Sequence, residues 1–576
     1  MLPKSRPSLR LFGVAIVFAI LWLLAVGKLF YVQAIQGKEY ASKAIQQQSR
    51  KFDIPAQRGL VYIKESDGLY PIALNTEVYN LAVDPKFVKD PGKTSDEISK
   101  IINTPSDQII DKLTANTRYA EINKAVSSEQ ADKLKSLSLP GVILQKRASR
   151  YYPEADLFSQ VLGYVNDDGE GQYGLEQFAN SDLSGTTGRY NTVTDALGVP
   201  INSAENTLID PKDGKSYVLT LDRGLQQVAS DALKAAVDGN KAESGSIIIM
   251  DPSTGAIKAM VNYPSYDPNN FRNVTDYKLF SNSSVSSLFE PGSGFKTITM
   301  ASGLDAGKVK PETTYNDTGE VVISGKTIKN AENHKFGIQN MTDVIQKSLN
   351  TGVVFVLEQL GGNPKEITAA GKQLFYEYLK KFGLGKVTGI EQAGEVSSQI
   401  KPPTTYDVDY ANMTFGQGIS VNSVQMLSAV SAIANKGVLV KPTIVAGTLD
   451  NNGDLIPNKP EVVRSVISSD AASKITQMMT QVVEHGSGWM TRMKGYSIAG
   501  KTGTAQVPRT DGLGYEANKN IGSFIGFAPA DNPKFIMFVR IDYPKVDGFA
   551  EVTAVPAFST VAKELFKYYQ VPPSGN

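Results

Sequence analysis

The chain has 576 residues, so two or three domains of ordinary size are expected. Its 59 Lys and Arg residues balance 58 Asp and Glu residues and no extended basic stretch is present, which argues against nucleic acid as a partner. The absence of cysteine excludes disulfides, thiolate metal sites and cysteine nucleophiles. Because His334 and His485 are the only histidines, we expect structural or surface roles for both, and neither a metal site nor a cofactor.

The N-terminal region contains one long apolar stretch. Residues 11–32 carry a single charge, Lys28, and are about as long as a helix that crosses a bilayer. Lys4, Arg6 and Arg10 precede the stretch, which predicts a cytoplasmic N-terminus and an extracytoplasmic remainder. A cleaved signal peptide is the alternative, but no Ala-x-Ala-like site ends the stretch. We therefore expect a single-pass anchor in the cell membrane.

The region from residue 52 to about 210 mixes both kinds of secondary structure and holds no catalytic cluster. A polar, helix-permissive segment, 38–51, leads into it, and residues 54–62 are predicted to form a strand. Residues 72–83 favour β-structure and residues 127–137 favour a helix.

A boundary is predicted at residues 211–215, before a second region that opens with strand, helix and hairpin. The segments concerned are a strand at 217–221, a helix at 223–237, and a hairpin of strands 244–250 and 256–262. With a late pair of strands at 523–527 and 534–541, they predict one sheet flanked by helices. The tail at 571–576 is expected to be frayed.

Ser293 and Lys296 form the first of three ordered clusters. A turn at 288–292 is predicted to start a helix at about Ser293, which places both side chains on one face. A lysine amine could then deprotonate the serine, and the helix N-terminus would favour an oxyanion. Alone, the pair is better explained by a serine helix cap followed by a solvated lysine.

The second and third clusters are Ser348-Leu349-Asn350 and Lys501-Thr502-Gly503-Thr504. Lys501 could lower the pKa of Lys296, and a strand over residues 498–506 could pair with an extended peptide. A phosphate-binding loop is the rival interpretation, because Gly495 precedes Gly500-Lys501-Thr502 at the required spacing. The predicted extracytoplasmic location and the strand-like residues 496–499 argue against that loop.

Serine-x-x-lysine, serine-x-asparagine and lysine-threonine-glycine in this order are typical of penicillin-binding proteins. Nearly the whole chain resembles a class B member of that family, a membrane-anchored peptidoglycan D,D-transpeptidase. Further segments similar to family landmarks are Arg58-Gly59, Gly174-Leu175-Glu176, Asp251-Pro252 with Thr254-Gly255, residues 263–269 and Phe415-Gly416-Gln417-Gly418.

The resemblance implies a role for each cluster residue. Ser293 would attack the penultimate D-alanine of a stem peptide, release the terminal D-alanine and pass the acyl group to a neighbouring amine; β-lactams would acylate the same serine. Lys296 would be the base and Ser348 a proton relay. The implied substrate-binding residues are Asn350, Lys501, Thr502, Gly503 and Thr504.

The resemblance also implies a multidomain α+β fold. It comprises one transmembrane helix, an extended mixed α/β pedestal, and a transpeptidase domain like that of serine β-lactamases, with a central antiparallel sheet flanked by helices. The expected divisions are a cytoplasmic tail at 1–10, the anchor at 11–32, a pedestal or dimerisation-like domain at 36–210, the transpeptidase domain at 211–570 and a tail at 571–576. The pedestal would meet a SEDS-family glycosyltransferase and other cell-wall synthesis proteins. Septal duty is favoured over elongation.

Two departures from the family pattern stand out. Leu349 replaces a serine found in many relatives, and residues 64–68 lack the usual Asp-Arg pair before a glycine. The open alternatives are a D,D-carboxypeptidase or β-lactamase on the same fold, a β-lactam sensor, and a non-catalytic scaffold for cell division. A sensor would need more membrane helices or a cytoplasmic effector, and a scaffold could lose Ser293 or Lys296, which this chain retains.

Overall fold

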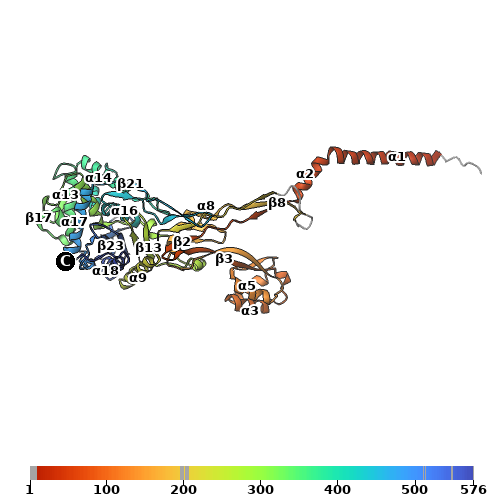
Figure 1. The fold of residues 1–576 in the computed structure, drawn as a ribbon, viewed down its shortest axis with the longest axis horizontal. Coiled ribbons are helices and arrows are strands. Elements are labelled where there is room, and N and C mark those ends of the chain that lie inside the picture. Colours follow the sequence, from red (N-terminus) through yellow and green to blue (C-terminus); the bar gives the residue numbers. More distant parts are fainter. Residues whose placement is uncertain are drawn as a thin grey trace, which may run out of the picture. The chain divides into compact units, whose positions relative to one another are not determined.

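A computed structural model (Figure 1) describes residues 9–194, 200–201, 207–509, 511–512, 514–546 and 549–574. Contacts divide the chain into two units. One unit takes in Met1–Gln57 and Gly185–Gly214, and the other takes in Arg58–Ser184 and Lys215–Asn576.

The first unit contains the apolar N-terminal helix. Helix α1 (Leu9–Phe30) continues through a π-helical turn at Tyr31–Ile35 and is followed by α2 (Gly37–Gln48). Within the described residues, Leu9–Ile35 is the one helix long and apolar enough to cross a membrane, and its large apolar side chains are exposed. The prediction of one apolar N-terminal helix is therefore confirmed. Most of the predicted tail, residues 1–8, lies outside the described residues.

The rest of the first unit is a small sheet in which β8 pairs antiparallel with three other strands. The strands are β1 (Ser49–Ile54), β8 (Gly188–Thr194), β9 (Pro200–Ile201) and β10 (Thr207–Ile209). The prediction of a continuous strand over residues 54–62 is wrong. Strand β1 ends at Ile54, because Pro55 has no backbone N–H to donate, and the next strand begins only at Val61.

A seven-stranded sheet in the second unit combines strands from both sides of residue 211. Its strands are β2 (Val61–Glu65), β3 (Gly68–Val83), β4 (Ala120–Ser127), β5 (Val142–Tyr151), β11 (Tyr217–Leu219), β19 (Val445–Leu449) and β20 (Leu455–Pro457). Strand β11 runs parallel to β2 and antiparallel to β19. At the far end of β3, a separate apolar core holds α3 (Pro91–Ile102), α4 (Ser106–Leu113) and α5 (Ser128–Ser136).

A buried ionic cluster joins two of the landmark segments of the sequence. Glu176 is fully buried and accepts from Arg58 Nη2 at 2.7 Å and from Arg150 Nε at 2.8 Å. Burial alone would raise the pKa of Glu176, but the two guanidinium groups outweigh that effect and hold it below its ordinary value. The carboxylate therefore stays charged and ties the residues after β1 to β5.

A five-stranded antiparallel sheet in the same unit carries the clusters of interest. The strand order is β13-β12-β24-β23-β22, with bounds β12 (Ser244–Met250), β13 (Ile257–Tyr263), β22 (Ala499–Pro508), β23 (Tyr515–Ala528) and β24 (Phe535–Asp542). The predicted hairpin corresponds to β12 and β13, and the predicted late pair to β23 and β24. The expected antiparallel sheet flanked by helices is thus confirmed.

Helices cover both faces of this sheet (Figure 1). Helices α9 (Arg223–Gly239) and α18 (Ala554–Tyr568) pack on one face, and α16 (Ser423–Ala434) and α17 (Ser469–His485) pack on the other. Helix α11 (Lys296–Asp305) packs against α17 and α13 (Asn350–Leu360). Every residue of α16 is buried, so this helix is a central element of the core.

The remaining helices and strands lie around these sheets, and the remaining strands form two-stranded sheets of their own. The helices are α6 (Ser159–Leu162), α7 (Gly174–Phe178), α8 (Asn180–Ser184), α10 (Ser283–Ser286), α12 (Met341–Gln346), α14 (Ala369–Lys381) and α15 (Asp407–Thr414). The strands are β6 (Tyr164–Val165), β7 (Gly171–Gln172), β14 (Thr314–Asp317), β15 (Glu320–Ile323), β16 (Lys326–Lys329), β17 (Gly337–Asn340), β18 (Val438–Val440) and β21 (Val462–Ser465).

The C-terminal segment differs from the prediction of a frayed tail. Ser574 donates from its backbone N to Gly495 O at 2.7 Å and from its Oγ to the same oxygen at 3.0 Å. The chain is therefore held in place up to Ser574, and residues 575–576 lie outside the described residues.

Candidate active site

Ser293 lies in a 3₁₀ turn, Gly292–Phe295, that leads directly into α11 at Lys296. The α-helix thus begins three residues later than predicted. Gly292 has a φ of +54°, and a Cβ at this position would lie 2.6 Å from Thr504 O. Gly416 has a φ of +80°, and a Cβ there would lie 2.2 Å from Gly292 O. Two glycines therefore let the turn fit between β22 and the segment after α15.

Ser348 joins the two lysines of the first and third clusters. It lies between α12 and α13 with a φ of +58°, in the left-handed region that serine seldom adopts. Lys296 Nζ donates to Ser348 O at 2.5 Å and to Ser348 Oγ at 3.1 Å. Lys501 Nζ donates to the same Oγ at 3.0 Å. The hydroxyl of Ser348 can therefore pass a proton between two amines.

Burial changes the charge state of both lysines, since each is 0% exposed. Desolvation, and next the nearby charge of Lys501, hold the pKa of Lys296 well below its ordinary value of 10.5. Desolvation lowers the pKa of Lys501 to about 7, although Glu551 acts in the opposite direction. The two amines contact one hydroxyl, so they titrate as a pair. A neutral amine is then available to act as a base near neutral pH.

The third cluster lies on β22, at the edge of the five-stranded sheet. Thr502 Oγ1 and Ser487 Oγ share a hydrogen bond of 2.6 Å, and Thr504 Oγ1 accepts from Ala550 N at 3.3 Å. A Cβ at Gly503 would lie 2.8 Å from Pro291 O, so this glycine lets β22 approach the nucleophile turn. An extended peptide could add beside β22 by main-chain hydrogen bonds.

Asn350 takes a different position from the other cluster residues. Its backbone N donates to Asn330 Oδ1 at 2.9 Å and its side-chain Nδ2 donates to Lys329 O at 2.7 Å. The structure therefore does not join Asn350 to Ser348 or to the lysines by a hydrogen bond. Only its Oδ1 could accept from a substrate amide.

Two neighbours of the site were missed by the sequence interpretation. Ser487 follows α17 in a Gly-Ser-Gly segment that carries no recognisable signal. Glu290 lies in the turn before Ser293 and accepts from Gly418 N at 2.8 Å and from Tyr515 O–H at 3.2 Å. Burial raises the pKa of Glu290, although both hydrogen bonds act against the rise. The signal that could have identified Glu290 as a site residue was its position in the sequence just before Ser293.

The remaining sequence candidates lie elsewhere. His334 and His485 are exposed, as expected for surface residues. In the part of the chain that the structure describes, no group of three or more His, Asp or Glu side chains is placed to hold a metal ion.

We expect Lys501→Met to change how the stability of the protein depends on pH. Since the folded-state pKa of Lys501 is about 7 and its ordinary value is 10.5, the unfolded chain keeps a proton that the folded chain loses between these values. Below pH 7 the folded state carries the full free-energy cost of burying the charged amine of Lys501. This cost decreases as pH rises to about 10. The melting temperature of the wild type should therefore rise relative to that of Lys501→Met across this window.

The matched control is Lys474→Met, which removes a lysine of α17 whose side chain is 40% exposed and pairs with Asp470. Its melting temperature should keep a constant offset from the wild type between pH 7 and 10. A constant offset for Lys501→Met as well would contradict the buried-amine argument.

Comparison with known proteins agrees with this geometry. Residues 245–565 match the penicillin-binding protein transpeptidase domain family, and residues 53–219 match the penicillin-binding protein dimerisation domain family. Stage V sporulation protein D of Bacillus subtilis is 31% identical over 575 residues, 98% of this chain and 87% of that protein. A peptidoglycan D,D-transpeptidase FtsI homolog of Mesostigma viride is 30% identical over 96% of this chain and 94% of that protein.

Solved structures give the same result. The crystal structure of penicillin-binding protein 3 from Mycobacterium tuberculosis, complexed with aztreonam, is similar with a TM-score of 0.69 and 25% identity, over 91% of this chain and 98% of that chain. A peptidoglycan synthetase from Bifidobacterium adolescentis is similar with a TM-score of 0.71 and 25% identity, over 92% and 98% of the two chains. The chain therefore belongs to the penicillin-binding protein transpeptidase family, and its two matched domains are those of a class B member.

Proposed function

We propose that this protein is a peptidoglycan D,D-transpeptidase that cross-links stem peptides through an acyl-enzyme on Ser293. The observation that carries the proposal is the meeting of two buried lysines on Ser348 Oγ, beside the turn that holds Ser293. The transpeptidase domain match and the relatives named as D,D-transpeptidases support the same activity. β-Lactams acylate the same serine because they resemble the terminal D-Ala-D-Ala of the stem peptide.

In the first half-reaction, a stem peptide lies along β22 and its terminal carboxylate binds Lys501, Thr502 and Thr504, with Gly503 giving the backbone room to approach. Neutral Lys296 takes the proton of Ser293 Oγ as this oxygen attacks the penultimate D-alanine carbonyl. The backbone N–H groups of Ser293 and Thr504 stabilise the oxyanion.

The leaving group departs by breaking the C–N bond to the terminal D-alanine. Ser348 passes a proton from the lysine pair to that amine, and free D-alanine leaves. In the second half-reaction, an amine of a neighbouring stem peptide loses a proton to Lys296 and attacks the ester. The new amide closes the cross-link and Ser293 recovers its proton. Asn350 Oδ1 accepts from an amide of the donor peptide.

The division of the chain supports a membrane-anchored arrangement. We assign residues 11–32 to the anchor, 36–210 to a pedestal and 211–570 to the transpeptidase domain, in keeping with the family matches. Lys4, Arg6 and Arg10 before the anchor favour a cytoplasmic N-terminus and an extracytoplasmic catalytic domain.

The pedestal is the part we assign to partner binding, with a SEDS-family glycosyltransferase as its principal partner. We assign the protein to septal cell-wall synthesis rather than elongation. A fluorescent fusion spread along the side wall, with none at division sites, would contradict the septal assignment.

The test uses the full chain with a donor stem pentapeptide and an acceptor amine, followed by mass spectrometry. We expect D-alanine release to match the amount of cross-linked product, and Ser293→Ala to release none. If water alone took the acyl group at every concentration of the acceptor amine, the protein would be a carboxypeptidase. Absence of D-alanine release in the wild type would favour the scaffold alternative.

A further inference from the structure

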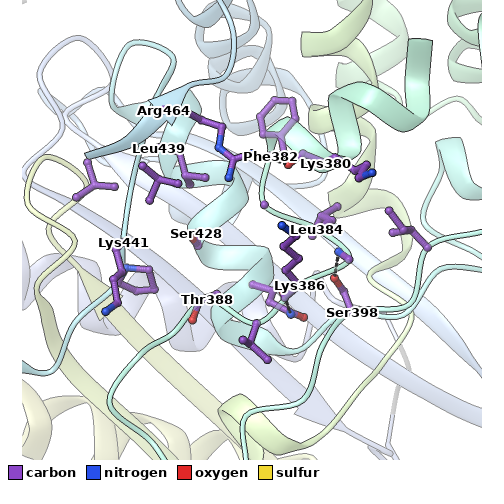
Figure 2. Close-up of a pocket in the computed structure, with 18 of the residues that line it drawn as sticks. Lys380, Phe382, Leu384, Lys386, Thr388, Ser398, Ser428, Leu439, Lys441 and Arg464 are labelled. Atoms are coloured by element: carbon purple, nitrogen blue, oxygen red, sulfur yellow. Dashed lines mark hydrogen bonds between the residues drawn. The ribbon is translucent and has the colours of Figure 1, made fainter. Parts of the chain in front are cut away.

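A cavity of about 480 Å³ in the second unit contains none of the residues of the candidate active site. Its walls come from the C-terminal end of α14, the loop at 382–388, α16, β18 and β21 (Figure 2). Its volume is in the range of sites that bind small molecules, roughly 300–1,000 Å³. The cavity is large enough to hold a ligand of its own.

The lining is strongly basic. Lys380, Lys386, Lys441 and Arg464 contribute to it, and no Asp or Glu residue does. The chain as a whole has almost equal numbers of acidic and basic residues, so four cations around one cavity are a local excess. Lys380, Lys386 and Arg464 are exposed and Lys441 is half-buried, so the cluster can meet a ligand that enters from solvent, and its sign favours an anion.

These cations are only weakly neutralised by the protein. Lys441 Nζ is 3.9 Å from Glu391 Oε1 and 3.8 Å from Glu461 Oε2, both long ion pairs. Arg464 Nη1 donates to a backbone oxygen, Lys380 O, at 3.2 Å. Figure 2 shows Arg464 and Lys386 entering from opposite sides and pointing toward the middle of the cavity. Two charged groups thus converge on the same space.

The nearest carboxylates are held by the loops instead. Glu395 accepts from Thr388 N at 2.6 Å and from Gly389 N at 2.9 Å. Glu391 accepts from Ile444 N and Thr443 Oγ1, each at 3.0 Å. These hydrogen bonds hold both carboxylates within the walls, and neither residue lines the cavity itself.

Ser428 adds a buried polar group to the lining. It lies on α16 with only 5% of its surface exposed, and its hydroxyl makes no hydrogen bond to any residue that the structure describes. Its hydroxyl can donate to an oxygen of a bound anion.

Part of the remaining lining is apolar. Phe382, Leu384 and Leu439 are buried in the walls, whereas Val387 and Val463 are 51% and 40% exposed. A free inorganic ion would leave this surface uncovered, so the lining suits a molecule that joins an anionic group to an apolar one.

We propose that this cavity binds a small phosphorylated molecule with an apolar group next to its phosphate. A phosphate monoester carries close to two negative charges and three acceptor oxygens, which match several cations and one hydroxyl better than a single carboxylate does. The source of this group is either a lipid headgroup or a soluble phosphate ester.

The test is calorimetric titration of the full chain, in non-ionic detergent, with 1-naphthyl phosphate. The titration is repeated after acylation with penicillin, so that binding at Ser293 is recognised. The variant is Lys386→Ala with Arg464→Ala. The matched control is Lys365→Ala with Lys381→Ala, two exposed lysines that do not line the cavity. Melting temperatures verify that both variants fold.

We expect binding with a Kd below about 1 mM, no effect of penicillin, at least tenfold weaker binding by the variant and unchanged binding by the control. Absence of binding, equal binding by the variant, loss on acylation, or equally tight binding of 1-naphthol would overturn the proposal. Dihexanoyl phosphatidic acid is then added as a competitor. Competition assigns the site to a lipid headgroup, and its absence assigns the site to a soluble phosphate ester.

Discussion

We expect Ser293→Ala to form no covalent adduct when the full-length protein is incubated with penicillin, whereas the wild type should gain the mass of one penicillin. Without the hydroxyl, the β-lactam ring has no nucleophile to open it, and the lysines and β22 remain as a binding surface only. By analogy with other serine acyltransferases, the acylation rate should fall by at least about 10⁴-fold. Intact-mass spectrometry over time measures both the adduct and its rate.

The matched control is Ser302→Ala, which alters a buried serine of α11, the helix after the turn of Ser293; its Oγ donates to Ile298 O. It should acylate at the wild-type rate. If Ser293→Ala still gained the penicillin mass, another residue would be the nucleophile and the assignment of Ser293 would fail. Absence of an adduct on the wild type itself would move the protein toward the scaffold alternative.

Lys296→Met should lower the acylation rate by roughly 10²–10⁴-fold without unfolding the protein. Methionine fills much of the lysine volume and removes an amine that is costly to bury, so the melting temperature should be kept or raised. The pKa of Lys296 is held far below its ordinary value, so its neutral form predominates above that lowered pKa. The acylation rate of the wild type should decline as pH falls through this lowered pKa. The acylation rate of Lys296→Met should show no such decline.

The control for this variant is Lys381→Met, which removes an exposed lysine at the end of α14. Stopped-flow measurements with a chromogenic cephalosporin give the rate across pH for all three proteins. A variant as fast as the wild type would show that Lys296 is not the base. A variant that loses activity together with its melting transition would indicate a structural role.

The residues of the candidate site could be predicted from the sequence, because the three clusters occur in a recognisable order. The spacing of Ser293 and Lys296 requires a helical turn, and the pattern of residues 498–506 requires a strand, so both local structures follow from short-range sequence. The meeting of Lys296 with Lys501 at Ser348 depends on how the turn that holds Ser293 packs against β22. The sequence suggested this neighbour only because a lysine base needs something to lower its pKa.

Other features depend on tertiary contacts that leave no local trace. Asn350 has an amide suited to a substrate, yet its Nδ2 is taken by Lys329 O, a contact with a distant strand. Ser487 reaches Thr502 only because α17 ends beside β22. Ser574 was expected to lie in a frayed end because it is close to the C-terminus, but it bonds to Gly495 O. The basic cavity likewise combines cations from separate elements.

The two glycines around the nucleophile turn limit how this protein can change under selection by β-lactams. Any side chain at Gly292 would collide with Thr504 O, and any side chain at Gly416 would collide with Gly292 O. Either collision would displace Ser293 and harm the natural substrate as much as the drug. Substitutions that reduce drug binding while sparing cross-linking should therefore arise away from this turn, where the cleft can change shape around a fixed serine.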